Sequence, residues 1–135
     1  MRFIACLLLV VTAACGSDAP TQPTSASVTG TWRLQTVNGT ALPFVAAQIG
    51  SDKVELTSDV LTAVQSGTFT RMTQIRVTQN GQASTQSISD AGSYTLSGTA
   101  VTFTFDGDGS SGTGSISGNT LTVAEDGFAY IYKRQ

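Results

Sequence analysis

Apolar and polar side chains alternate with a period of two along most of the chain beyond residue 30. Trp32 and Leu34 alternate with polar neighbours, and Val101, Phe103 and Phe105 alternate with threonines. This alternation places one face of a β-strand on a core and the other face in water. The pattern predicts strands over residues 30–37, 53–57, 59–65, 67–78, 82–88, 92–97, 100–106, 112–117, 119–124 and 127–133.

Turn-forming residues separate these segments at short, even spacing. Asn38-Gly39, Asn80-Gly81 and Asp126-Gly127 suit two-residue hairpin turns, whose central positions both require positive φ. The sequence therefore predicts an all-β fold of about eight to ten short antiparallel strands, either a barrel or a sandwich. An up-and-down β-barrel is favoured because closure removes exposed sheet edges. Residues 43–51 are the one segment predicted to form a short helix or lid, ended by Gly50.

The N-terminus has the features of an export signal. A basic start is followed by the apolar run 3–11, which is shorter than the about 20 residues of a transmembrane helix but suits a secretory signal. Thr12, Ala13 and Ala14 then precede Cys15, and this arrangement resembles the lipobox of bacterial lipoproteins. The resemblance implies a signal peptide over residues 1–14 and a lipid on Cys15. Ordinary cleavage near Ala14, leaving a free thiol, is the alternative.

Residues 15–29 predict a flexible linker, because they combine prolines with small polar residues and have almost nothing to bury. The barrel domain is then predicted over residues 30–135. The lipoprotein resemblance, with Gly16 after the cysteine and Asp18 one place later than the inner-membrane retention signal, implies a lipid anchor in the outer membrane, facing the periplasm. Cys6 leaves with the signal peptide, so no disulfide is expected.

Composition argues against catalysis and nucleic-acid binding. The chain has no histidine and a formal charge of −2, so the commonest general base and metal ligand is absent and the field for binding nucleic acid is weak. We therefore predict a protein that is not an enzyme and uses no cofactor. The acidic residues mostly adjoin predicted turns, where solvated positions are expected.

The segment 106–112 (DGDGSSG) is the richest local motif. Asp106, Asp108 and Ser110 imitate the start of a calcium loop, but its sixth and twelfth positions hold Ser111 and Ser117 instead of Gly and Glu. A flexible hairpin loop is the favoured interpretation, and no metal site is predicted.

The two ends of the predicted domain carry a family resemblance. Gly30-Thr31-Trp32 resembles the Gly-x-Trp motif of lipocalins and related calycin barrels, and the phrase from Gly30 together with the terminal YIYKR resembles lipocalin-like domains of small bacterial lipoproteins. A weaker resemblance is to META-type lipoproteins. The lipocalin resemblance implies that Trp32 closes one barrel end and that Arg134, or alternatively Lys133, stacks across it.

The interior of such a barrel is the predicted ligand site. An eight-stranded barrel is wide enough either to fill itself with side chains or to hold one small ligand. Arg71 shares strand parity with Phe69, so it is expected to point inward and to suit an anionic head group, unless a bulge at Met72 turns it outward. The candidate lumen residues are Trp32, Phe69, Arg71, Tyr94, Phe103, Phe105 and Tyr130.

Two functions follow from these patterns. The first is a membrane-tethered barrel that binds a small hydrophobic or amphipathic ligand. The alternative is a structural or interaction protein of the cell envelope, such as a stress component or an inhibitor of a secreted hydrolase, that uses the segments 43–52 and 107–114. No protein partner is identified by the sequence.

Overall fold

The computed structural model describes residues 26–135, which form ten β-strands and no helix. The predicted signal peptide, Cys15 and most of the predicted linker lie outside these residues. Within the described part, no helix is long and apolar enough to span a membrane. The strands are β1 (Gly30–Val37), β2 (Thr40–Ala41), β3 (Phe44–Ile49), β4 (Asp52–Ala63), β5 (Thr68–Gln79), β6 (Gln82–Ser97), β7 (Ala100–Phe105), β8 (Ser111–Ser117), β9 (Thr120–Glu125) and β10 (Phe128–Arg134).

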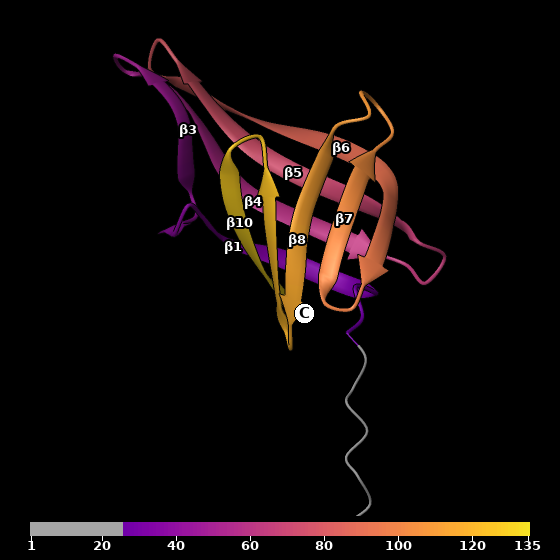
Figure 1. Ribbon diagram of the computed structural model, residues 1–135. Helices are drawn as coiled ribbons and strands as arrows, with labels where there is room; N and C mark the ends of the chain where they lie inside the picture. The colour runs from indigo at the N-terminus through magenta and orange to yellow at the C-terminus, as the bar shows by residue number, and fades with distance from the viewer. Residues whose placement is uncertain (1–25) are drawn as a thin grey trace, which may run out of the picture.

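Eight of the strands close into an antiparallel barrel (Figure 1). Neighbours follow the order β1-β10-β9-β8-β7-β6-β5-β4, and β4 pairs back to β1. Trp32 is the position of closure, because it pairs with Arg134 on one side and with Leu61 on the other. The predicted all-β barrel is confirmed, including the pairing of the first strand with the last. The short β2 and the edge strand β3 lie outside the ring.

The predicted hairpin turns are confirmed by their backbone angles. Asn38, Asn80 and Asp126 have φ values of 49°, 52° and 50°, and the glycine that follows each of them also has positive φ. Glycine tolerates this conformation without steric cost, and Asn and Asp tolerate it better than other residues.

Some predicted elements were wrong in kind or in length. Residues 43–51 form no helix or lid, because β3 pairs with β4 and its Phe44 lies opposite Leu56. The segments predicted over 53–57 and 59–65 fall in the single strand β4, which ends at Ala63. A bulge between Leu56 and Ser58 reverses the alternation within β4 and imitates a break. The segments 82–88 and 92–97 likewise form the single strand β6.

The packed domain begins ahead of the predicted boundary at residue 30. The side chain of Val28 is 1% exposed and belongs to the hydrophobic core. Its carbonyl oxygen accepts a 2.7 Å hydrogen bond from Trp32 Nε1. This bond gives the buried indole N–H its partner, so the segment before β1 closes the base of the barrel.

Long strands carry part of the sheet beyond the ring (Figure 1). β3 pairs with β4 residues 52–56, these pair with the end of β5, and the end of β5 pairs with the start of β6. β7 joins β6 only from Gly92 onward. We call the extension the wing; it comprises β3 and residues 52–56, 74–79 and 82–91.

Candidate functional site

Trp32 and Arg134 close one end of the barrel, as the lipocalin resemblance implied. The Arg134 guanidinium lies 4.1 Å from the centroid of the Trp32 ring, and the indole is fully buried. Arg134 also donates hydrogen bonds to the carbonyl oxygens of Ser27 and Thr29. A Cβ atom at Gly30 would lie 2.7 Å from Arg134 Nη1, so glycine leaves the space that the guanidinium occupies. Lys133 instead donates to Thr120 Oγ1 and is exposed.

Aromatic side chains fill the interior above this plug. The Phe69 ring packs edge-on against Phe103 and Phe105, with centroid distances of 5.1 and 5.2 Å. Tyr94 is half-buried beside Phe103, and its hydroxyl donates to the carbonyl oxygen of Val64. Of the predicted lumen residues, Trp32, Phe69 and Phe103 are therefore buried and serve as packed core in this structure.

Arg71 points into the barrel, where its guanidinium reaches Glu125 on the opposite wall. β5 shows no register shift at Met72 against β4 or β6, so the bulge that would turn Arg71 outward is absent. Arg71 Nη1 lies 2.6 Å from Oε2 of Glu125, and Nη2 lies 3.2 Å from Oε1. Four strand steps separate β5 from β9 in either direction around the ring. This bidentate pair therefore braces opposite walls.

Two further carboxylates and an aromatic ring surround the same guanidinium. Arg71 lies 3.8 Å from Asp59 and 3.5 Å from Asp90, and its charge stacks 4.6 Å from the centroid of the Phe105 ring. Burial lowers the pKa of Arg71, but the hydrogen bonds and charge of Glu125 and the charge of Asp59 outweigh burial and raise it. Arg71 is therefore already paired with carboxylates and has little capacity left for an anionic head group.

Asp59 is a charged group held deep in the barrel, with an exposed fraction of 3%. It accepts hydrogen bonds from the hydroxyls of Thr73, at 2.9 Å, and Tyr132, at 3.2 Å. Burial raises the pKa of Asp59, and the charge of Arg71 only partly opposes that rise. Burial also raises the pKa of Tyr132 well above its ordinary value, so this phenol stays protonated and donates.

The sequence did not identify the carboxylates around Arg71. Asp59 and Glu125 were expected to be solvated, and that expectation was wrong, because both lie against a buried guanidinium. A signal was present for Asp59, which shares the inward parity of Leu61 and Ala63 on β4. For Glu125 no local signal exists, since only closure of the ring brings β9 opposite β5.

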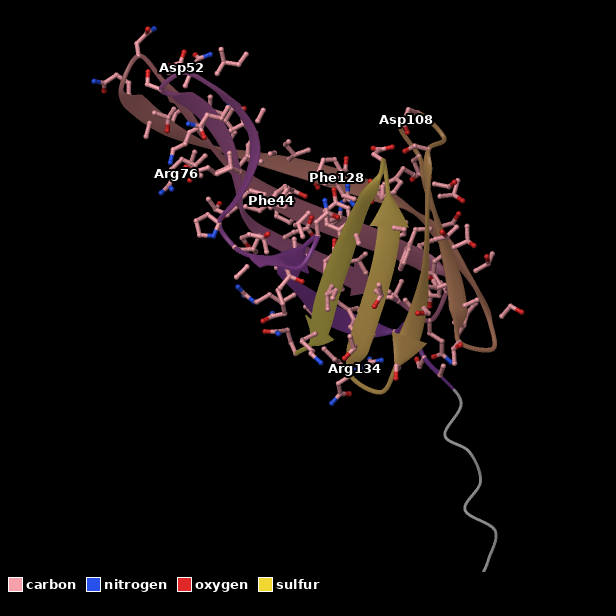
Figure 2. The ribbon with its side chains drawn as sticks, turned by 60° about the vertical axis from the view of Figure 1, so that its left-hand side comes forward. Phe44, Asp52, Arg76, Asp108, Phe128 and Arg134 are labelled. Atoms are coloured by element: carbon pink, nitrogen blue, oxygen red, sulfur yellow. The ribbon has the colours of Figure 1, made fainter. Side chains whose placement is uncertain are left out.

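A pocket of about 410 Å³ opens above the ion pair, at the barrel end opposite Arg134. Asp108 and Arg134 mark the two ends in Figure 2. We call it the mouth pocket; its lining includes Arg71, Phe105, Asp90, Asp106, Asp108, Glu125 and Asp126. It carries more acidic than basic groups, so its field disfavours anions.

The loop at residues 106–110 forms one rim of the mouth pocket. Asp108 Oδ1 accepts a 2.9 Å hydrogen bond from the Ser110 amide. Hydrogen bonding by the Ser110 side chain, and then by its amide, lowers the pKa of Asp108. The carboxylate thus stabilises the loop that joins β7 and β8. Among residues 26–135, no group of three or more potential ligands is placed to hold a metal ion.

The wing continues the inward face of the barrel past the mouth pocket. On β5, Phe69 in the core, Arg71 at the mouth pocket, and then Ile75 and Val77 share one face, because alternate residues of a strand do. The direct partners of Ile75 and Val77 on β4 are Leu56 and Val54. Phe44 and Ala47 extend this surface onto β3. We call it the wing's inner face.

This inner face is apolar and only partly covered. The Phe44 ring meets Phe128 of β10 edge-on at 6.0 Å, and Phe128 adjoins Tyr130, another predicted lumen residue, at 6.3 Å (Figure 2). Farther out, Val54 and Val77 remain partly exposed and line a second pocket of about 270 Å³.

The opposite face of the wing is ionic. Glu55 lies 3.0 Å from Lys53 and 2.8 Å from Arg76. The hydrogen bonds from Arg76 and from Lys53 lower the pKa of Glu55 to about 2, so this carboxylate stays charged at neutral pH. The ion pairs therefore lie on one side of the wing, and the apolar surface lies on the other.

Two solved structures are similar to the chain at low sequence identity. An uncharacterized protein from Bacteroides eggerthii DSM 20697 is 12% identical, with a TM-score of 0.38, over 79% of this chain and 98% of the other. Echinococcus granulosus fatty-acid-binding protein 1 is 14% identical, with a TM-score of 0.33, over 79% of this chain and 96% of its own. No curated protein sequence matches the chain.

The family of the chain is identified by a sequence match to a family model and not by these distant structures. The sequence from residue 28 to residue 123 matches the lipocalin-like domain, which is well over half of the chain. The matched segment begins at the buried Val28 and includes Trp32, Arg71 and Phe105. A closed antiparallel barrel with one plugged and one open end is compatible with binding a small ligand. The chain therefore belongs to the lipocalin-like domain family.

Proposed function

We propose that this protein is a membrane-tethered lipocalin-like barrel that binds a small amphipathic ligand at its open end. The observation that carries the proposal is the partly uncovered inner face of the wing, which leads directly into the mouth pocket. Apolar surface of this kind is usually covered in a protein that binds nothing. A concave site that combines apolar walls with a few polar groups is typical of small-molecule binding.

The ligand's apolar part lies along β5 and its polar part at the mouth pocket. From Arg71 to Val77 the strand advances six residues, or about 20 Å at the usual rise of a strand. Ile75 and Val77 supply apolar surface at the outer end of this path, and Arg71 lies among carboxylates at its inner end. A ligand with an alkyl chain and a compact polar head group fits a path that is apolar at one end and charged at the other.

The charge of the mouth pocket sets which head groups bind. Asp106, Asp108 and Asp126 add negative charge to a site whose only cation, among its lining residues, is already paired with Glu125. An anionic head group meets repulsion there, whereas an uncharged or cationic head group does not.

Calorimetric titration with three probes that share a decyl chain tests this function. Decylamine and decyl maltoside are expected to bind, and decanoate to bind at least tenfold more weakly. Val77→Asp places a charge on the inner face and is expected to weaken binding of decylamine by tenfold or more. Gln74→Asp is the matched control, because Gln74 is exposed and its side chain points to the opposite face of β5. Absence of binding by all three probes to the unaltered chain overturns the proposal.

The tether rests on the residues around Cys15 and on the position of the first described residue. Ala26 lines a groove with Arg134 at the plugged end of the barrel. A lipid on Cys15 would therefore hold that end toward the membrane and leave the mouth pocket facing the periplasm. An outer-membrane location is the arrangement that the residues after Cys15 favour.

Metabolic labelling with an alkyne-tagged fatty acid tests the tether. We expect the full chain to be labelled and to sediment with outer membranes. Cys15→Ala should abolish both, whereas Cys6→Ala should abolish neither, because Cys6 lies in the segment that is removed. Labelling that survives Cys15→Ala contradicts the proposed anchor while leaving ligand binding untouched.

A further inference from the structure

The wing ends in an uncovered strand edge. β6 pairs with β5 along residues 82–93 without a register shift, but β7 joins β6 only at Gly92. Residues 82–90 therefore have a hydrogen-bonded neighbour on one side only, whereas the Ala91 carbonyl oxygen accepts a 3.0 Å hydrogen bond from the Asp106 amide. The transition at Gly92 is fixed by sterics, because a Cβ atom there would lie 2.0 Å from the carbonyl oxygen of Thr104.

This edge lacks the features with which proteins usually prevent strand pairing. Such features are charged side chains, proline, bulges and very short length. Residues 82–89 (QASTQSIS) contain no charge and no proline, and their pairing with β5 is free of bulges. Ile88 is moreover 45% exposed. An extended, uncharged edge of this kind pairs readily with another strand.

We infer that two copies of the chain form a dimer by antiparallel pairing of their β6 edges. The two-fold axis brings together two bare edges of equal length and matching hydrogen-bond pattern, and it closes the assembly. Because residues 82–89 are uncharged, two copies can pair them in any register without placing like charges opposite each other. The occupant of the edge is therefore a second copy of this chain.

The other free edge of the wing is a poorer partner. β3 is six residues long and has a register shift between Val45 and Ala47. Bulges twist an edge strand and disfavour further pairing. Pairing of β6 with β3 of the next copy would also be head-to-tail and would produce open filaments. The geometry therefore favours a closed pair through β6.

The dimer extends the proposed binding surface. A two-fold axis perpendicular to the sheet keeps equivalent faces on the same side, so the inner faces of the two wings join into one continuous surface. Ile75 and Val77 of each copy then lie on a sheet of eight strands, four from each wing. This inference does not depend on ligand binding.

Sedimentation equilibrium of the full chain in density-matched nonionic detergent tests the interface. We expect a monomer–dimer equilibrium that shifts with protein concentration. Combining Thr85→Lys with Ser87→Lys places two cations on the same face of the edge, and it should weaken the dimer at least tenfold. Thr113→Lys with Ser115→Lys is the matched control on β8, which has a neighbour on both sides; its dissociation constant should stay within twofold.

A mixing experiment and hydrogen exchange locate the contact. The Thr85→Glu, Ser87→Glu variant should dimerise as poorly alone as the lysine variant, and an equimolar mixture of the two should regain the dimer. Amide protection should rise with concentration over residues 82–90 and not over 44–49. A monomer at every concentration, a lysine variant that behaves like its control, or assemblies larger than a dimer with protection in β3 each overturn the inference.

Discussion

Replacing Arg71 by methionine tests whether the ion pair that spans the barrel braces the fold. Methionine keeps much of the side-chain volume and its contact with Phe105, but it removes the guanidinium. Glu125 and Asp59 then lose the cation that lies 2.6 and 3.8 Å from them. The two carboxylates are left in a poorly hydrated interior, where unpaired charge is costly.

The size of the effect follows from the geometry. Two unit charges about 4 Å apart attract by about 4 kcal/mol at an effective dielectric constant of about 20. Arg71 and Glu125 are only 15% and 10% exposed, so solvent screens the pair weakly. Removing one member of a buried pair costs about 3–5 kcal/mol, and we expect Arg71→Met to lower the free energy of unfolding by about that amount.

Urea denaturation followed by Trp32 fluorescence measures this loss, because the single tryptophan is buried at the plugged end. Arg33→Met is the control; Arg33 is exposed, and its replacement should change stability by less than about 0.5 kcal/mol. A double-mutant cycle with Glu125→Gln should give a coupling energy of about 2–3 kcal/mol. Additive single effects, or a stable Arg71→Met variant, would refute the idea that this pair braces the barrel.

Three further predictions concern Asp59, Gly92 and Arg134. Burial raises the pKa of Asp59 in the folded state, so the free energy of unfolding falls as the pH rises and this carboxyl group ionises. In urea titrations, Asp59→Asn should have the same free energy of unfolding as the unaltered chain at a pH below the ordinary pKa of aspartate. At pH 7 it should have a higher one. Gly92→Ala should lower the melting temperature, since its Cβ would lie 2.0 Å from Thr104 O, whereas Gly107→Ala, with open space around it, should not. Arg134→Gln should lower the free energy of unfolding by about 1–2 kcal/mol through lost stacking and carbonyl contacts, and Lys133→Gln should change it little by the same measurement.

The sequence predicted the barrel because local rules determine most of it. Alternating side chains identified the ring strands, and pairs such as Asn80-Gly81 located the turns, where the backbone takes the expected positive φ. The wing was harder to predict. A bulge after Leu56 changed the parity of β4, and the polar start of β6 shows little alternation, so two long strands were each divided into two short ones.

The candidate site depends on contacts that sequence reasoning reaches only in part. Strand parity placed Arg71 inside, but parity says nothing about which strand lies opposite. Glu125 is 54 residues away and on the far wall, so its role needs the strand order and the register around the ring. The inner face of the wing was missed for the same reason, because β3 was expected to be a helix or lid.

Mapping amide and indole chemical shifts during titration with decylamine tests the central claim most directly, because it reports where a ligand binds. The account predicts shifts at Val77 on the inner face and along residues 106–110 at the mouth pocket, with the Trp32 indole unchanged. Shifts centred on Trp32 and Arg134, or no saturable shifts anywhere, would contradict a binding site at the open end of the barrel.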